Sequence, residues 1–259
     1  MPTSFALLAL ALVAGAAPES PAEAAARLDA LRLPAASFSA RLDVATQDRA
    51  GGKKESWTFD LFARKTSSQR DATFDVLLRC AEPAADLGKR LLFTREGCWM
   101  QDPKAKRPVK VPAQQMWAQG SVADSLTWSL ARDFEAADAG PDTLDLENQQ
   151  ARVASHCYEF TPRPSAAFAA GRMKWWLDDR GLALQSEHAI GGNRLVRTVQ
   201  FTGYAEVLGG RHPVAMRTFA RNEKCEITLS GHRALDVPAA WTDPAGFGTA
   251  GLPAGAPAR

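Results

Sequence analysis

Short runs in which apolar and polar residues alternate fill the chain between residues 37 and 230. In the first run Phe38, Ala40, Leu42 and Val44 alternate with more polar residues, which is typical of a β-strand buried on one face. Further strands are predicted over residues 57–61, 74–80, 89–94, 98–101, 109–111, 157–160, 173–177, 182–188, 195–207, 213–221 and 226–230. Turns of a few residues separate most of the later runs, so the sequence predicts an antiparallel meander.

Two segments have a helical pattern instead. Residues 20–23 (SPAE) form a capping box with proline at the first helical position, and they predict a helix over residues 22–32 that ends before Pro34. In residues 121–134 apolar side chains recur every fourth position, from Val122 to Phe134, which predicts one amphipathic helix interrupting the strands. This second helix is either packed permanently on the core or a lid over a cavity, and the pattern is compatible with both.

The N-terminus resembles an export signal. Residues 5–13 are apolar but too few to span a bilayer, and Ala14, Gly15 and Ala16 form the small-residue pattern that a signal peptidase accepts. We therefore predict a signal peptide over residues 1–16, cleaved near Ala16, and a periplasmic protein; the alternative is a buried N-terminal helix. The remaining chain is predicted to be one domain over residues 17–242, followed by a disordered tail rich in Pro, Gly and Ala over residues 243–259.

The charge and the cysteines exclude some classes of partner and site. A formal net charge of +2 argues against nucleic acid as a partner and allows peripheral membrane contact at most. The four cysteines have no zinc-like spacing, so no metal site is predicted. Cys80 and Cys98 flank one strand pair and are the best candidates for a disulfide, whereas four buried free thiols are the alternative.

No catalytic pattern is present in the sequence. It contains no GxSxG elbow, no HExxH, no phosphate-binding loop and no dinucleotide fingerprint. The four histidines lie on different predicted strands, where a surface position or a core position explains each of them. The sequence therefore predicts a protein that is not an enzyme and needs no cofactor.

Several short segments, in a fixed order, resemble the outer-membrane lipoprotein-sorting family of LolA/LolB-like periplasmic carriers, and in particular its branch associated with RND-type exporters. The segments are LGKRLLF (87–93), GCWMQDP (97–103), KRPVKVP (106–112), QGS (119–121), YEFTP (158–162), MKWWLD (173–178), RTVQF (197–201) and GRHPVAM (210–216). The resemblance implies a mainly β fold, in which a strongly curved antiparallel sheet forms an incomplete β-barrel. Helices would cover its open side and enclose an apolar cavity.

The resemblance also implies a function. The expected protein is a carrier that binds acyl chains of a lipid or lipoprotein and delivers them towards the outer membrane, with an RND-type exporter as a further partner. The alternatives are an envelope-stress sensor or an exporter-associated binding subunit of the same fold. Side-chain bulk and alternation predict a cavity lining of Phe59, Leu61, Phe74, Val76, Leu78, Leu91, Phe93, Trp99, Leu126, Leu130, Trp175 and Trp176. Trp175 and Trp176 are adjacent and must point to opposite faces, so only one of them is expected to contact lipid.

Overall fold

The structure is a computed structural model. It describes residues 19–48, 52, 54–67, 72–112, 122–123, 125–147, 152–164, 166, 171–190, 194–220, 223–248 and 251–252. The predicted signal peptide lies outside the described residues.

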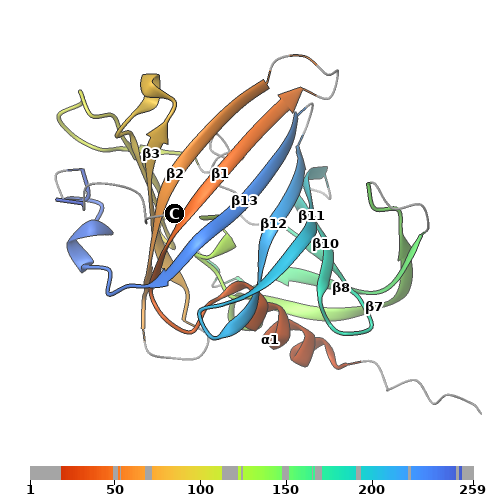
Figure 1. The fold of residues 1–259 in the computed structure, drawn as a ribbon. Coiled ribbons are helices and arrows are strands. Elements are labelled where there is room, and N and C mark those ends of the chain that lie inside the picture. The colour runs from red at the N-terminus through yellow and green to blue at the C-terminus, as the bar shows by residue number, and fades with distance from the viewer. Residues whose placement is uncertain are drawn as a thin grey trace, which may run out of the picture.

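The described strands form one antiparallel sheet of 13 strands that bends strongly but does not close (Figure 1). Its order is β6-β5-β4-β3-β2-β1-β13-β12-β11-β10-β9-β8-β7, so the chain starts at the centre, runs out to one edge, crosses to the other edge and returns. The curved, incomplete antiparallel sheet is therefore confirmed. The strands are β1 (Phe38–Asp48), β2 (Lys54–Lys65), β3 (Phe74–Glu82), β4 (Arg90–Thr94), β5 (Gly97–Gln101), β6 (Val109–Val111), β7 (Phe134–Leu144), β8 (Val153–Pro162), β9 (Met173–Leu177), β10 (Ala183–Ile190), β11 (Arg194–Val207), β12 (Gly210–Ala220) and β13 (Glu223–Ala234).

Helix α1 (Pro21–Arg32) forms as its sequence predicts. The hydroxyl of Ser20 accepts from the backbone N–H of Glu23, and the Glu23 carboxylate accepts from the N–H of Ser20. Its buried side chains Ala24 and Leu28 pack on an inner cluster that includes Tyr158 and Phe160 of β8. In Figure 1 the helix lies at one end of the curved sheet, where it contacts β7 and β12.

The single helix predicted over residues 121–134 is wrong. Of this segment, Val122, Ala123 and Ser125 are helical, residues 126–129 are not, and a separate short helix α3 (Leu130–Asp133) follows. The break has two causes: the carbonyl of Leu126 accepts from the N–H of Phe74 on β3, and Ser129 caps α3 by accepting from the N–H of Arg132. The fourfold apolar spacing therefore reflects two short pieces packed on the core.

No strand is predicted between residues 134 and 144, yet strand β7 occupies this segment. The β7–β8 register shifts between Asp138 and Gly140, and Gly140 has a φ of 87°, so a bulge absorbs the glycine within the strand. The carboxylate of Asp138 accepts from the N–H of Gly140 and stabilises the bulge.

Apolar clusters cover both faces of the sheet. One cluster, on the convex face, contains Phe62, Leu77 and Leu92 together with Val237 and Phe247 of the C-terminal segment. Figure 1 shows this segment beside β2 and β3, on the outer side of the sheet. Phe247 is 0% exposed, so the disorder predicted from residue 243 onward is wrong for residues 243–248. The composition of this segment predicted a disordered tail, but the phenyl ring of Phe247 packs on the apolar cluster of the convex face. Residues 253–259 lie outside the described residues.

Cys80 and Cys98 do not form the bridge considered above, since all four cysteines are buried free thiols. Cys98 faces Phe93 on β4, and Phe93 faces Val76 on β3, so Cys98 is level with Val76 rather than with Cys80. Four residues along a strand are about 13 Å, which is far beyond the 7 Å that a disulfide allows between Cα atoms.

Candidate functional site

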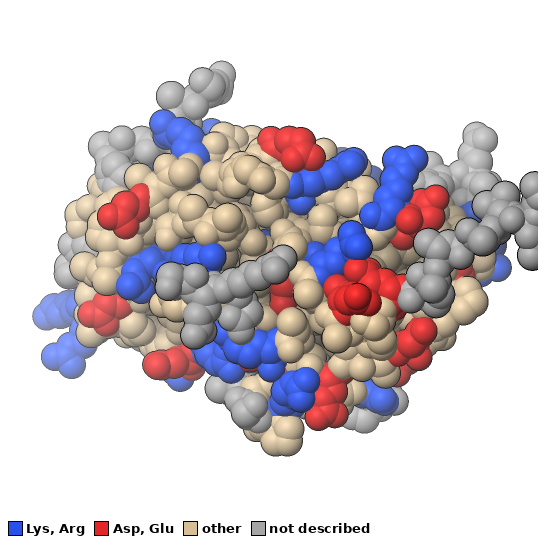
Figure 2. All heavy atoms as spheres, turned by 90° about the horizontal axis from the view of Figure 1, so that it is seen from below, with Lys and Arg blue, Asp and Glu red and all other residues tan. Residues whose placement is uncertain are grey.

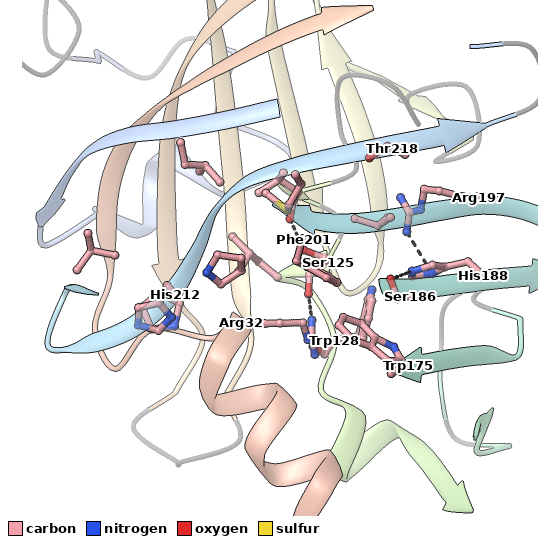
Figure 3. Close-up of a pocket in the computed structure, with 18 of the residues that line it drawn as sticks. Arg32, Ser125, Trp128, Trp175, Ser186, His188, Arg197, Phe201, His212 and Thr218 are labelled. Carbon is pink, nitrogen blue, oxygen red and sulfur yellow. Dashed lines mark hydrogen bonds between the residues drawn. The ribbon is translucent and has the colours of Figure 1, made fainter. Parts of the chain in front are cut away.

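The inner side of the sheet holds a cavity of about 70 Å³. Strands β9 to β13 supply most of its wall. The part that is not strand comes mainly from Arg32 of α1 and from Val122, Ser125, Leu126 and Trp128 (Figure 3). The lining residues are mostly apolar, with a minority of arginine, histidine and hydroxyl side chains. They are Arg32, Pro34, Phe38, Val122, Ser125, Leu126, Trp128, Trp175, Ser186, His188, Arg197, Val199, Phe201, Val207, His212, Pro213, Met216, Thr218, Leu229 and His232.

Strand register explains why these side chains meet. Trp175 of β9 faces Ser186 of β10, and Ser186 faces Val199 of β11. Val199 in turn faces Thr218 of β12. Residues directly opposite one another on antiparallel strands point to the same face, so this row lies across the cavity wall.

A polar group is buried in this wall. The guanidinium of Arg197 lies 3.2 Å from Nδ1 of His188, and the hydroxyl of Ser186 lies 3.2 Å from Nε2 of the same ring (Figure 3). Burial, reinforced by the positive charges of Arg197 and Arg32, holds the pKa of His188 well below its ordinary value. The imidazole is therefore neutral at physiological pH.

The part of the wall that is not strand is tied to α1 by a buried ion pair. Arg32 donates to Asp29 at 2.6 Å and also to the carbonyls of Ser125 and Trp128. Its guanidinium lies 4.0 Å from the ring centroid of Trp128, a cation–π contact. Asp29 in turn accepts from the backbone N–H of Leu130 at 2.8 Å. One pair of charges therefore positions the segment that closes this side of the cavity.

The predicted lining residues divide into three groups. Leu126 and Trp175 line the cavity itself. The inner clusters contain Leu130 and, in the group around β2 to β5, Phe59, Leu61, Phe74, Val76, Leu78, Leu91 and Phe93. Trp99 packs on the convex-face cluster, and Trp176 packs in a separate small cluster with Leu144 and Cys157.

The polar side of the cavity was not predicted from the sequence. Arg32, His188 and Arg197 are absent from the predicted lining because apolar bulk was its criterion. Arg197 has the same strand parity as Val199 and Phe201, so the alternation alone could have placed this arginine on an inner face.

Other kinds of site find little support in the described part of the chain. No group of three or more His, Cys, Asp or Glu side chains within the described ranges could hold a metal ion. Among those same residues, no helix has both the length and the apolar character to cross a membrane. On the face shown in Figure 2, acidic and basic side chains are interspersed rather than gathered by sign, so this face does not resemble a polyanion-binding surface.

Comparison with known proteins identifies the fold. No protein-family model matches the chain, and no curated protein matches it by sequence. A LolA superfamily protein from Nitrosomonas europaea is similar with a TM-score of 0.67 at 14% identity, over 87% of this chain and 98% of that chain. A DUF1329 family protein from Desulfovibrio piger is similar with a TM-score of 0.69 at 17% sequence identity, over 87% of this chain and 98% of that chain. A domain from Vibrio parahaemolyticus, assigned to outer membrane lipoprotein sorting, is similar with a TM-score of 0.64 at 14% sequence identity, over 82% of this chain and 91% of that chain. The open, curved sheet of this chain is therefore the fold of the LolA superfamily.

Proposed function

We propose that the protein is a periplasmic carrier that holds an acyl chain of a lipid or lipoprotein in the inner cavity and delivers it towards the outer membrane. The observation that carries the proposal is an apolar cavity on the concave side of a sheet with the LolA fold. The assignment of the similar Vibrio domain to lipoprotein sorting supports the same reading.

The energetics of such a site need no specific polar recognition. Each buried methylene contributes about 0.8 kcal/mol, so about ten of them supply about 8 kcal/mol, equivalent to a Kd of about 1 µM. The cavity of about 70 Å³ is small beside the pockets of roughly 300–1,000 Å³ that hold drug-sized ligands. A chain of that length therefore enters only if the cavity widens.

The wall around Leu126 and Trp128 is the part best suited to move. It is not held in the sheet ladder, whereas the opposite wall belongs to consecutive paired strands. Displacement of this wall would leave the pairing of the strands intact, and it would break the hydrogen bonds that the carbonyls of Leu126 and Trp128 accept from Phe74 and Arg32. A wall that moves while the sheet stays paired suits a carrier, because a carrier must also release its cargo.

Native mass spectrometry of the exported protein, purified without detergent, tests the function directly. A bound mass that extracts as lipid, or saturable uptake of a fluorescent acyl probe, is the expected result. An empty protein that also fails to take up the probe would sink the carrier proposal. An RND-type exporter as partner stays a prediction, to be checked by co-purification from membranes.

A matched pair of variants locates the binding site. Val199 lines the cavity, and Val109 is 52% exposed on the edge strand β6. Val199→Phe should fill the cavity and displace at least two methylenes, which weakens probe binding by about tenfold or more. Val109→Phe makes the same chemical change and should bind the probe as the wild type does. Equal binding by both variants would place the probe elsewhere.

A further inference from the structure

One end of the cavity wall is more polar than a store for hydrocarbon requires. We define the donor corner as the side chains of Trp175, Ser186, His188, Arg197 and Thr218, all of which line the cavity (Figure 3). Trp175, Ser186 and Thr218 lie in one row across strands β9 to β12, with Val199 between Ser186 and Thr218. His188 and Arg197 face each other two positions further along β10 and β11. Burying polar groups in a hydrocarbon site is unfavourable unless they bind something.

The hydrogen bonds of His188 fix the direction in which Ser186 can donate. Arginine can only donate, so Nδ1 of His188 is the acceptor of the Arg197 bond at 3.2 Å. The neutral ring then carries its hydrogen on Nε2, which donates to the Ser186 hydroxyl at 3.2 Å. The hydroxyl hydrogen of Ser186 therefore remains available to an acceptor in the cavity.

Two further donors in the corner have no acceptor within the part of the chain that the structure describes. Nε1 of Trp175 and Oγ1 of Thr218 are buried without a hydrogen-bond partner among the described residues. Their side chains belong to residues that are 2% and 1% exposed, so bulk water does not satisfy them. An unmatched buried donor is destabilising, and its persistence is a common sign of a ligand site.

The charge of the wall has the same sign as these donors. The described lining residues include Arg32 and Arg197 but no Asp or Glu. Arg32 pairs with Asp29, which lies outside the lining, and Arg197 donates to the ring of His188 inside the cavity. The corner thus offers N–H and O–H donors in a positive field, the complement of an oxyanion.

We propose that the donor corner binds the oxyanion of a single-chain acidic lipid, with the guanidinium of Arg197 as its counter-ion. The aliphatic chain lies along Val199, Met216 and Leu229 of the same cavity. The inference deepens the proposed carrier function by naming its ligand class, and it rests on that function. A carboxylate and a phosphate monoester present the same chemistry to an arginine, so either headgroup fits.

Competitive displacement of a fluorescent acyl probe at pH 7.5 tests the inference with three ligands of equal chain length. These are a long-chain carboxylic acid, the alkyl phosphate and the uncharged alcohol. At least one of the two acids should bind tenfold or more tightly than the alcohol, and the tighter one identifies the headgroup. Equal binding of all three would overturn the anion site and leave the carrier intact. If none binds, the carrier function fails and the inference fails with it.

Two variants and a control assign the effect to the corner. Arg197→Gln should reduce the preference for acid over alcohol from tenfold or more to about one. Thr218→Val removes a hydroxyl that has no partner among the described residues, so the Tm should stay or rise while acid binding falls at least threefold. Thr228→Val, on the exposed side of the neighbouring strand β13, should change neither quantity. Unchanged acid preference in both corner variants would overturn the assignment.

Discussion

Replacing Asp29 with asparagine should destabilise the protein strongly although the side chain keeps its shape. Asp29 is 7% exposed and accepts hydrogen bonds from the hydroxyl of Ser129 at 2.6 Å and the N–H groups of Leu130 and Ala131 at 2.8 and 3.0 Å. Its fourth donor is Arg32, at 2.6 Å. Asparagine would place an N–H₂ among these donors and leave the buried guanidinium without its carboxylate.

The expected loss is about 3–5 kcal/mol, as for other buried pairs that lose one partner. Urea unfolding measures it; with a slope of about 3 kcal/mol per molar, the midpoint should fall by about 1–1.7 M. Glu19→Gln is the matched control, because Glu19 pairs with Arg27 beside the same helix but 23% and 47% of the two side chains are exposed. The control should lose less than about 1 kcal/mol. A loss in Asp29→Asn as small as in the control would refute the role of this ion pair in holding the wall.

Three more predictions concern the buried groups. Burial raises the pKa of the Cys80 and Cys225 thiols to about 11 and that of Cys157 to about 12, so the native protein should react slowly with a thiol reagent at pH 8 and release four thiols on unfolding; fast native reaction would contradict this. Truncation after residue 242 removes Phe247 from the convex face and should cost about 3 kcal/mol or more, whereas truncation after residue 252 retains it; equal Tm values would contradict the packing. Burial lowers the pKa of His188, so the ring is neutral in the folded protein, whereas the unfolded chain binds an extra proton below about pH 6.5. The free energy of unfolding therefore decreases as the pH is lowered, by up to about 1.4 kcal/mol per pH unit. Urea midpoints between pH 7.5 and 5.5 should show a shallower decline for His188→Gln, and an identical decline would exclude the contribution of this ring.

Local sequence patterns predicted the secondary structure correctly wherever the conformation of an element depends only on contacts within that element. The capping box before α1 needs only residues within one helical turn, and the alternation of β1, β2 and β10 to β13 needs only one strand at a time. The turn at Asp178 is of the same kind, since its carboxylate accepts from the N–H groups of Arg180 and Leu182. These features depend on contacts a few residues apart, which a sequence displays directly.

Errors occurred where a distant partner decides. Strand β7 persists through Gly140 because β8 pairs with it. The helical pattern after residue 121 breaks where Phe74 of β3 donates to the carbonyl of Leu126. The C-terminal segment folds back because Phe247 finds the convex face of β2 to β4. None of these partners is close in sequence, so the local periodicity of apolar residues does not predict these contacts.

The sequence by itself determined that this protein is a meander of alternating strands beginning with one capped helix, because alternation and capping are short-range. The tertiary structure alone decided which apolar residues face the cavity. Both faces of the sheet carry apolar clusters, so alternation separates Trp175 from Trp176 without saying which one points inward. Register across β9 to β12 selects Trp175 and brings Arg197, His188 and Ser186 beside it, since only the pairing of strands distant in sequence gives a face its neighbours.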